Sequence, residues 1–151
     1  MSMAKRIYNV VLQSAIGDGS TTSNERFFYD WTQIPDVPYY VTFSFMSATT
    51  AITQFGQTAM LYVDLSQSYN QIATSQTSIQ SAYKGQFLGN LLYGVVAANN
   101  FLVAGNSTNP PTFLNRRPLS NNFTVEIRSA LNVNYTLPSG VYCLILAFQE
   151  C

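Results

Sequence analysis

The chain contains no histidine, and this absence removes several classes of function at once. Histidine is the usual general base near neutral pH and the commonest ligand of protein-bound metals. Without it, the serine- and cysteine-based triads and the histidine-ligated zinc, iron and copper sites cannot be built. The two cysteines, Cys143 and Cys151, are too few for a structural zinc site. We therefore expect no catalytic residues, no metal site and no bound cofactor.

The other groups that carry chemistry also lack a functional pattern. Gly17-Asp18-Gly19 has no Lys-Ser/Thr pair after it, so it is typical of a hairpin turn rather than a phosphate-binding loop. The acidic residues are scattered, and no pair stands out as the two carboxylates of a glycosidase. Asp64, beside the polar stretch 66–84, offers too few charged oxygens for calcium. The sequence predicts that the protein is not an enzyme.

Charge is scarce as well. Charged residues make up 9% of the 151, with seven of each sign and a formal net charge of zero, whereas ordinary soluble domains carry about a quarter. Such a chain cannot neutralise a phosphate backbone or an anionic membrane surface, so we expect no nucleic-acid partner. A monomer with net charge near zero tends to associate. The composition therefore predicts a protein that packs among others, as a homo- or hetero-oligomer.

Long apolar runs are missing, and no segment reaches the length needed to insert into a bilayer. The N-terminal stretch begins with basic residues, but Asn9 and Gln13 interrupt its apolar part, which favours a strand over a signal peptide. Two cysteines without a disulfide framework predict a reduced intracellular chain. The sequons at Asn106, Asn122 and Asn134 are then expected to be chance matches.

What the sequence does contain is period-two alternation of apolar and polar residues. In YYVTFSFMS, Val41, Phe43 and Phe45 alternate with Thr42 and Ser44. The expected strands are residues 5–13, 24–32, 39–47, 59–65, 86–97, 100–104, 122–129 and 140–149. The last of them is apolar on both faces, which predicts a central strand covered on each side.

Eight strands with long, irregular connections predict one all-β domain over residues 1–151, an eight-stranded jelly-roll sandwich of two antiparallel sheets. An immunoglobulin-like sandwich is the rival. It has about seven strands and, in its commonest form, a Cys–Trp–Cys order, whereas Trp31 precedes both cysteines here.

The segment NPPTFLNRRPLSNNFTVEI, residues 109–127, combines prolines with an arginine doublet. Prolines lower the entropy lost when a loop is ordered at a contact, and a guanidinium can donate forked hydrogen bonds to a neighbour. Tyr and Arg are enriched at protein–protein contacts. The candidate interface residues are Arg116, Arg117, Phe113, Tyr39, Tyr40, Tyr69 and Tyr83. A solvated loop is the alternative for the doublet.

The same segment carries a resemblance. Pro110-Pro111-Thr112-Phe113, Arg117-Pro118, the Asn-rich entry 121–125 and the Tyr-containing apolar strand 142–148 resemble the single jelly-roll capsid proteins of large icosahedral double-stranded DNA viruses. The resemblance implies a minor capsid protein of the virion, made in the host cytoplasm, that cements neighbouring capsomers. Its implied partners are the major capsid protein and other minor capsid proteins. A penton vertex protein is the alternative within the family.

Two functions of another class stay open. One is a trimeric binding module of the C1q or tumour-necrosis-factor type, and the other is a carbohydrate-binding sandwich that uses exposed tyrosines. The sequence leaves open the copy number, the oligomeric state and the face of the shell on which the protein would lie.

Overall fold

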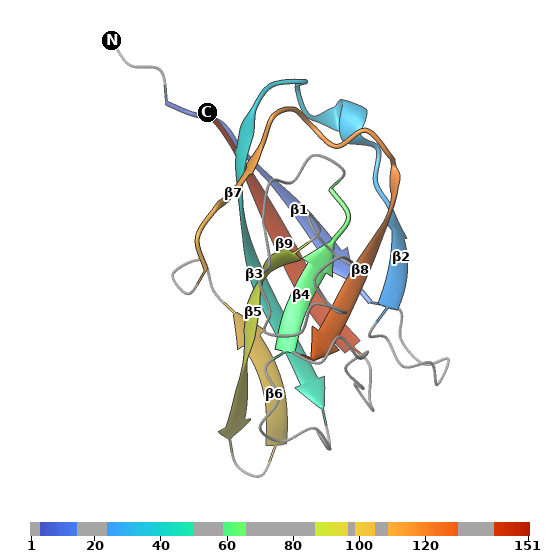
Figure 1. Ribbon diagram of the computed structural model, residues 1–151, viewed down its shortest axis with the longest axis vertical. Helices are drawn as coiled ribbons and strands as arrows, with labels where there is room; N and C mark the ends of the chain where they lie inside the picture. Colours follow the sequence, from blue (N-terminus) through green and yellow to red (C-terminus); the bar gives the residue numbers. More distant parts are fainter. Residues whose placement is uncertain are drawn as a thin grey trace, which may run out of the picture.

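The computed structural model describes residues 4–14, 24–49, 59–65, 87–96, 99–104, 109–129 and 141–151. This part of the chain forms strands and one short 3-10 helix (Figure 1). The elements are β1 (Ile7–Gln13), β2 (Asn24–Phe28), η1 (Trp31–Gln33), β3 (Tyr39–Thr49), β4 (Ala59–Val63), β5 (Phe87–Val96), β6 (Asn99–Ala104), β7 (Thr112–Leu114), β8 (Asn122–Ser129) and β9 (Val141–Glu150). None of the described segments is a helix long and apolar enough to span a membrane.

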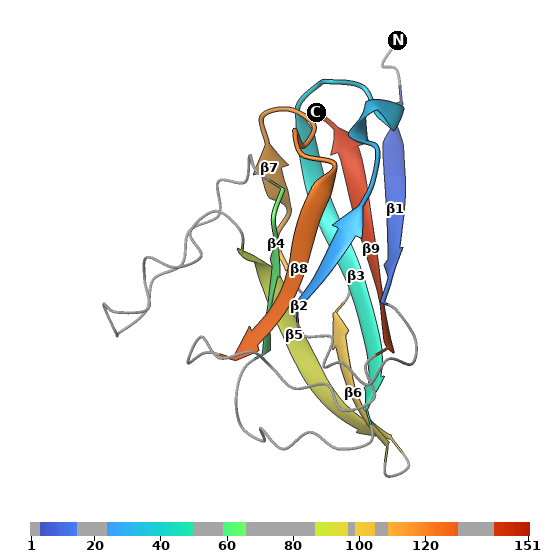
Figure 2. The same ribbon diagram turned by 90° about the vertical axis from the view of Figure 1, so that its right-hand side faces the viewer.

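The strands form two antiparallel layers, with order β1-β9-β3-β6 in one and β5-β4-β8-β2 in the other. Figure 2 shows β1, β9 and β3 on one side of the molecule and β4 and β8 on the other. β1 pairs with β9, β2 with β8, β3 with β6, and β4 with β5, so the chain forms a long ribbon that is folded over on itself. This is the jelly-roll arrangement, and it confirms the predicted fold class.

The core lies between the two layers and follows the predicted alternation. The inward side chains of β3, β4 and β8 are almost fully buried, whereas Thr42 and Ser44 on the other face of β3 are only half-buried. The buried members on these strands include Val41, Phe43, Phe45, Leu61, Val63, Phe123, Val125 and Ile127. They carry the hydrophobic stabilisation of the sandwich, since each removes most of its apolar surface from water.

β9 corrects one expectation. It is central in its sheet, between β1 and β3, but only one of its faces is covered. Tyr142, Leu144 and Leu146 are buried, while Cys143 and Ile145 on the opposite face are half-buried. In a sandwich of antiparallel sheets only one face of each sheet meets the core. The apolar residues on the other face of β9 therefore belong to the outer surface.

The expected strand over residues 24–32 ends early, at Phe28. The chain then turns into η1, because the carboxylate of Asp30 accepts hydrogen bonds from the backbone N–H of Thr32 at 3.1 Å and from its hydroxyl at 2.6 Å. An aspartate that bonds the backbone two residues on is a helix N-cap, and it competes with strand formation. These hydrogen bonds also lower the pKa of Asp30, the side-chain bond from Thr32 most of all.

β7 was not predicted. It is three residues long and pairs with the beginning of β3, where Tyr39 lies opposite Leu114. Three residues are too few to show an alternation. β7 nevertheless positions the Pro-rich part of residues 109–127, because its pairing with β3 attaches this segment to the β1-β9-β3 sheet.

A close contact holds β5 where it passes from one sheet to the other. Its first half pairs with β4, and from Leu92 onward it pairs with β6. The side chain of Asn109 accepts from the N–H of Asn90 at 2.9 Å and donates to its carbonyl at 3.1 Å, as a neighbouring strand would. At Gly89 an added Cβ would lie 2.6 Å from both Asn109 Oδ1 and the ring of Phe43. Only glycine fits this crossing without a rearrangement.

Candidate protein interface

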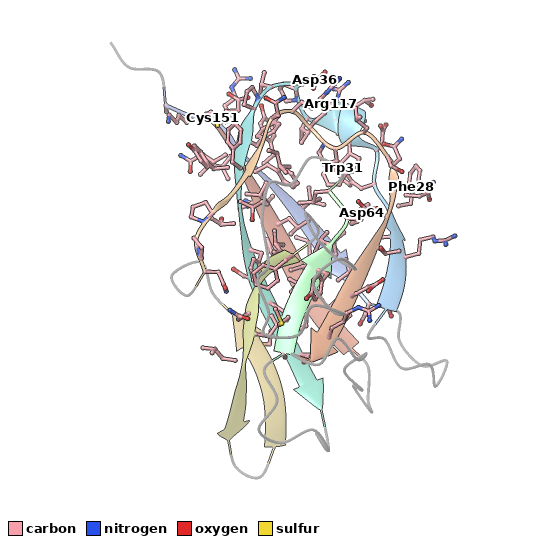
Figure 3. All side chains as sticks on the ribbon, in the orientation of Figure 1. Phe28, Trp31, Asp36, Asp64, Arg117 and Cys151 are labelled. Atoms are coloured by element: carbon pink, nitrogen blue, oxygen red, sulfur yellow. The ribbon has the colours of Figure 1, made fainter. Side chains whose placement is uncertain are left out.

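The connection between β7 and β8 closes one end of the sandwich, where Asp36, Arg117 and Trp31 lie near one another (Figure 3). Arg116 donates from Nε and Nη2 to the two carboxylate oxygens of Asp36, at 3.2 and 2.6 Å. The two side chains are 46% and 37% exposed. An ion pair this exposed contributes about 0–1 kcal/mol. Its main effect is to hold the connection in one place.

Arg117 makes a second attachment. It is half-buried, and its Nη1 donates to the carbonyl oxygen of Ile34 at 2.9 Å. The doublet therefore joins the β7–β8 connection to the chain between η1 and β3. The forked geometry expected for an arginine is present, but its acceptor is Asp36 of the same chain. A contact between subunits through these two residues stays a prediction.

Trp31 completes this end of the molecule, and sequence reasoning had given it no role. Its indole Nε1 donates to the carbonyl of Ser120 at 3.0 Å, and its backbone N–H donates to the side chain of Asn121 at 3.2 Å. The indole is 1% exposed and packs against Phe123 and Phe148, with ring centroids 5.4 and 5.2 Å away. A lone tryptophan directly after a capping aspartate is the signal that could have indicated this anchor.

Tyr39 requires a correction, because it lies in the core and not at the surface. Its side chain is 0% exposed, its ring contacts Tyr8 and Phe148, and its hydroxyl donates to the carbonyl of Pro35 at 2.5 Å. Burial, with a smaller contribution from the carboxylate of Glu150, raises the pKa of Tyr39 to about 12. A fully buried ring cannot contact a neighbouring subunit. The preceding Pro38 does not mark it as a surface residue.

Tyr40 and Phe113 do lie on the surface, as the interface interpretation requires. They are 45% and 38% exposed, and their rings contact each other at a centroid distance of 5.6 Å, tilted by 59°. β3 and β7 place them opposite each other in the sheet. The remaining two candidates, Tyr69 and Tyr83, lie outside the described residues.

The outer face of β1, β9 and β3 is the surface that sequence reasoning missed. The strand register places one outward row from each strand side by side. We call this surface the outer face; its described residues are Ile7, Asn9, Val11, Gln13, Cys143, Ile145, Ala147, Gln149, Tyr40, Thr42, Ser44 and Met46. None of them is charged. Ile7, Val11 and Met46 are 56%, 61% and 65% exposed.

The opposite layer differs. The outward side chains of β2 and β8 include the charged residues Arg26, Glu126 and Arg128, and Asp64 directly follows β4. Arg128 and Glu126 form an ion pair at 2.7 Å. Among the described residues, the two broad faces of the sandwich are therefore chemically distinct, one charged and one uncharged.

Comparison with protein-family models and with curated protein sequences gives no match for this chain. Within the described residues, no group of three or more His, Cys, Asp or Glu side chains lies together as a metal ion would need.

The arrangement of these side chains suits a contact with another protein. One end of the sandwich is cross-linked by the hydrogen bonds of Arg116, Arg117 and Trp31, and the aromatic pair Tyr40–Phe113 lies at the margin of the outer face. An uncharged sheet face that exposes Ile7, Val11 and Met46 favours burial against another protein. The candidate site is thus an interaction surface.

Proposed function

We propose that this chain is a structural, non-enzymatic component of an icosahedral virus shell, a minor capsid protein that cements neighbouring capsomers. The observation that carries the proposal is the uncharged outer face of a jelly-roll sandwich, on which Ile7, Val11 and Met46 are exposed. An outward sheet face is normally polar, and protein interfaces are depleted of charge at their centre. The resemblance of residues 109–127 and of the last strand to single jelly-roll capsid proteins supports the same role.

The hydrogen bonds at one end of the sandwich also support a cementing role. Arg116–Asp36, Arg117–Ile34 and Trp31–Ser120 hold two connections against each other before any partner arrives. A loop that is already ordered loses less entropy on binding. The partners we propose are the major capsid protein and other minor capsid proteins, in virions assembled after synthesis in the host cytoplasm.

The penton role is the alternative within this class. It differs in position, since a penton occupies five-fold vertices while a cement protein lies between capsomers. A carbohydrate-binding role gains little support from the described residues. The exposed pair Tyr40–Phe113 is tilted by 59° and does not form one flat surface on which a sugar ring could stack.

Cryo-electron microscopy of the native particle tests the proposal. We expect density for this jelly roll between larger capsomers, with the outer face of β1, β9 and β3 turned toward a neighbouring protein. Density at the five-fold vertices would favour the penton role. Absence of the chain from purified particles, measured by mass spectrometry, would overturn the capsid role altogether.

A further inference from the structure

β1 and β2 are the two ends of the strand order, so each is an edge strand of its layer. β2 is five residues long and contains Glu25 and Arg26. Short length and charge are the usual protection of an edge against pairing with another chain. β1 is seven residues long and contains neither charge nor proline. Of these two end strands, only β1 lacks this protection.

Hydrogen bonds at the two ends of β1 show which of its residues direct their backbone N–H and carbonyl groups toward β9 and which direct them away. The carbonyl of Arg6 accepts from the N–H of Glu150, and the N–H of Ser14 donates to the carbonyl of Tyr142, each at 3.0 Å. Even-numbered residues of β1 therefore direct their backbone groups toward β9. Because these directions alternate in an antiparallel ladder, the outward donors and acceptors belong to the residues between them. These are Ile7, Asn9, Val11 and Gln13, and no other described strand pairs with them.

We propose that β1 pairs antiparallel with β1 of a second copy of this chain, about a two-fold axis at Val10. In this register Ile7 lies opposite Gln13 of the other copy, and Asn9 lies opposite Val11. Each outward N–H and carbonyl of the four residues then meets a partner of matching spacing. The four-stranded layers of the two copies join into one continuous sheet.

The side chains fit this register. On the core side, Tyr8 lies opposite Leu12 and Val10 lies opposite itself, so apolar side chains meet apolar side chains. Opposed like charges are absent, because β1 contains no charged residue. Lys5 and Arg6 precede β1, and the antiparallel register separates those of one copy from those of the other by about 25 Å or more. That distance exceeds the Debye length of about 8 Å at physiological salt.

Self-pairing follows from the symmetry of the edge. A two-fold interface places one patch against itself, so a patch that is its own complement favours a homodimer. The zero formal net charge adds no long-range repulsion between copies. One strand pair buries less than the roughly 800 Å² per partner of a standard interface, so we expect a reversible dimer. This pairing does not depend on the capsid role.

Sedimentation velocity of the purified full chain over a range of concentrations tests the pairing. The wild type should shift reversibly from monomer to dimer. Asn9→Pro removes an outward N–H and leaves the hydrogen bonds to β9 intact, and it should weaken the dimer about tenfold or more because both copies lose a donor. Val11→Asp places a charge on the edge and should act the same way. Met46→Asp is the matched control, on the same outer face but on β3, and should leave the dimer unchanged.

The outcomes are distinct. A wild type that stays monomeric at millimolar concentration overturns the proposal. Loss of the dimer in Met46→Asp, with Asn9→Pro unaffected, would assign the contact to the outer face and not to the edge. Amide exchange of the wild type by NMR needs no variant. The amides of Ile7, Asn9, Val11 and Gln13 should gain protection as concentration rises, and unchanged exchange at these amides would overturn the pairing.

Discussion

Arg116 and Arg117 bind within their own chain, and this decides the effect of replacing them. Arg116→Glu would place a carboxylate beside Asp36, and Arg117→Glu would remove the hydrogen bond to the carbonyl of Ile34. A hydrogen bond to a charged group contributes about 1.5–3 kcal/mol, and the exposed ion pair adds little. We expect the double variant to lose about 1–3 kcal/mol of unfolding free energy in denaturant titration.

The exposed Arg26→Glu on β2 is the control for this experiment and should change stability by less than about 0.5 kcal/mol. Exchanging the charges of the pair, with Arg116→Asp and Asp36→Arg together, should restore most of the unfolding free energy that is lost when Arg116 no longer pairs with Asp36. A double variant as stable as the wild type would show that the doublet does not hold the two connections together.

Replacement of Phe43 tests which side chains form the core. It is 3% exposed on the inward face of β3. Phe43→Ala should cost about 3–5 kcal/mol, through lost burial and the cavity left behind. Phe28→Ala is the matched control, because Phe28 is 69% exposed on β2, and it should change stability by less than about 0.5 kcal/mol. Equal losses for the two variants in denaturant titration would contradict the assigned strand faces.

The pH dependence follows from the tyrosines and from the missing histidine. Stability should be flat between about pH 5.5 and 7.5, because no histidine titrates there. The pKa of Tyr39 in the folded state is raised from 10.0 to about 12. The stability that the neutral Tyr39 hydroxyl contributes is therefore complete below its unfolded-state pKa and is lost as the pH rises from about 10 to about 12. Burial raises the pKa of Tyr142 in the same direction.

Denaturant midpoints measured against pH, for the wild type and for Tyr39→Phe, test this dependence. Tyr39→Phe cannot ionise, so the difference between the two proteins should shrink above about pH 10. A constant difference across that range would mean that the Tyr39 hydroxyl is not held in its neutral form.

At the scale of elements, the crossing of β5 depends on Gly89. An added Cβ would lie 2.6 Å from Asn109 Oδ1 and from Phe43 Cε1, so Gly89→Ala must move the core ring or break the Asn109 contact. We expect a loss of about 1–3 kcal/mol, as in other overpacked cores. The control is Asn90→Ala, because the side chain of Asn90 is exposed on the same strand. Equal unfolding free energies for Gly89→Ala and the wild type would show that the crossing adapts.

The alternation of apolar and polar residues predicted most strands, because the inward side chains of a strand recur at every second residue. The strand expected over residues 122–129 coincides with β8, and the one expected over residues 39–47 falls within β3. The elements that were missed depend on distant partners. β7 is defined by its pairing with β3, and η1 is stabilised by contacts from Trp31 to Ser120 and Asn121. Local periodicity contains no information about such partners.

The candidate site was predicted less completely, for the same reason. Arg116 and Arg117 were recognised as unusual, but their acceptors lie about 80 residues away in the sequence. Tyr39 and Tyr40 are adjacent and look alike in sequence, yet the pleat of β3 turns one into the core and the other outward. The outer face became visible only when the register placed β1, β9 and β3 side by side.

At the scale of the whole molecule, the described residues give the sandwich one charged and one uncharged broad face, and a charge added to each face distinguishes their roles. Met46→Asp adds a charge to the outer face, and Phe28→Asp makes the same kind of change on the opposite layer. Met46 and Phe28 are 65% and 69% exposed, so both variants should fold with nearly unchanged thermal midpoints.

If the outer face contacts a neighbouring protein in the shell, Met46→Asp should reduce incorporation into particles about tenfold or more, since an unpaired charge would be buried there. Phe28→Asp should be incorporated normally. The measurement is the ratio of this chain to the major capsid protein in purified particles, by quantitative mass spectrometry. Equal incorporation of both variants would remove the outer face from the contact, and a loss confined to Phe28→Asp would move the contact to the charged layer.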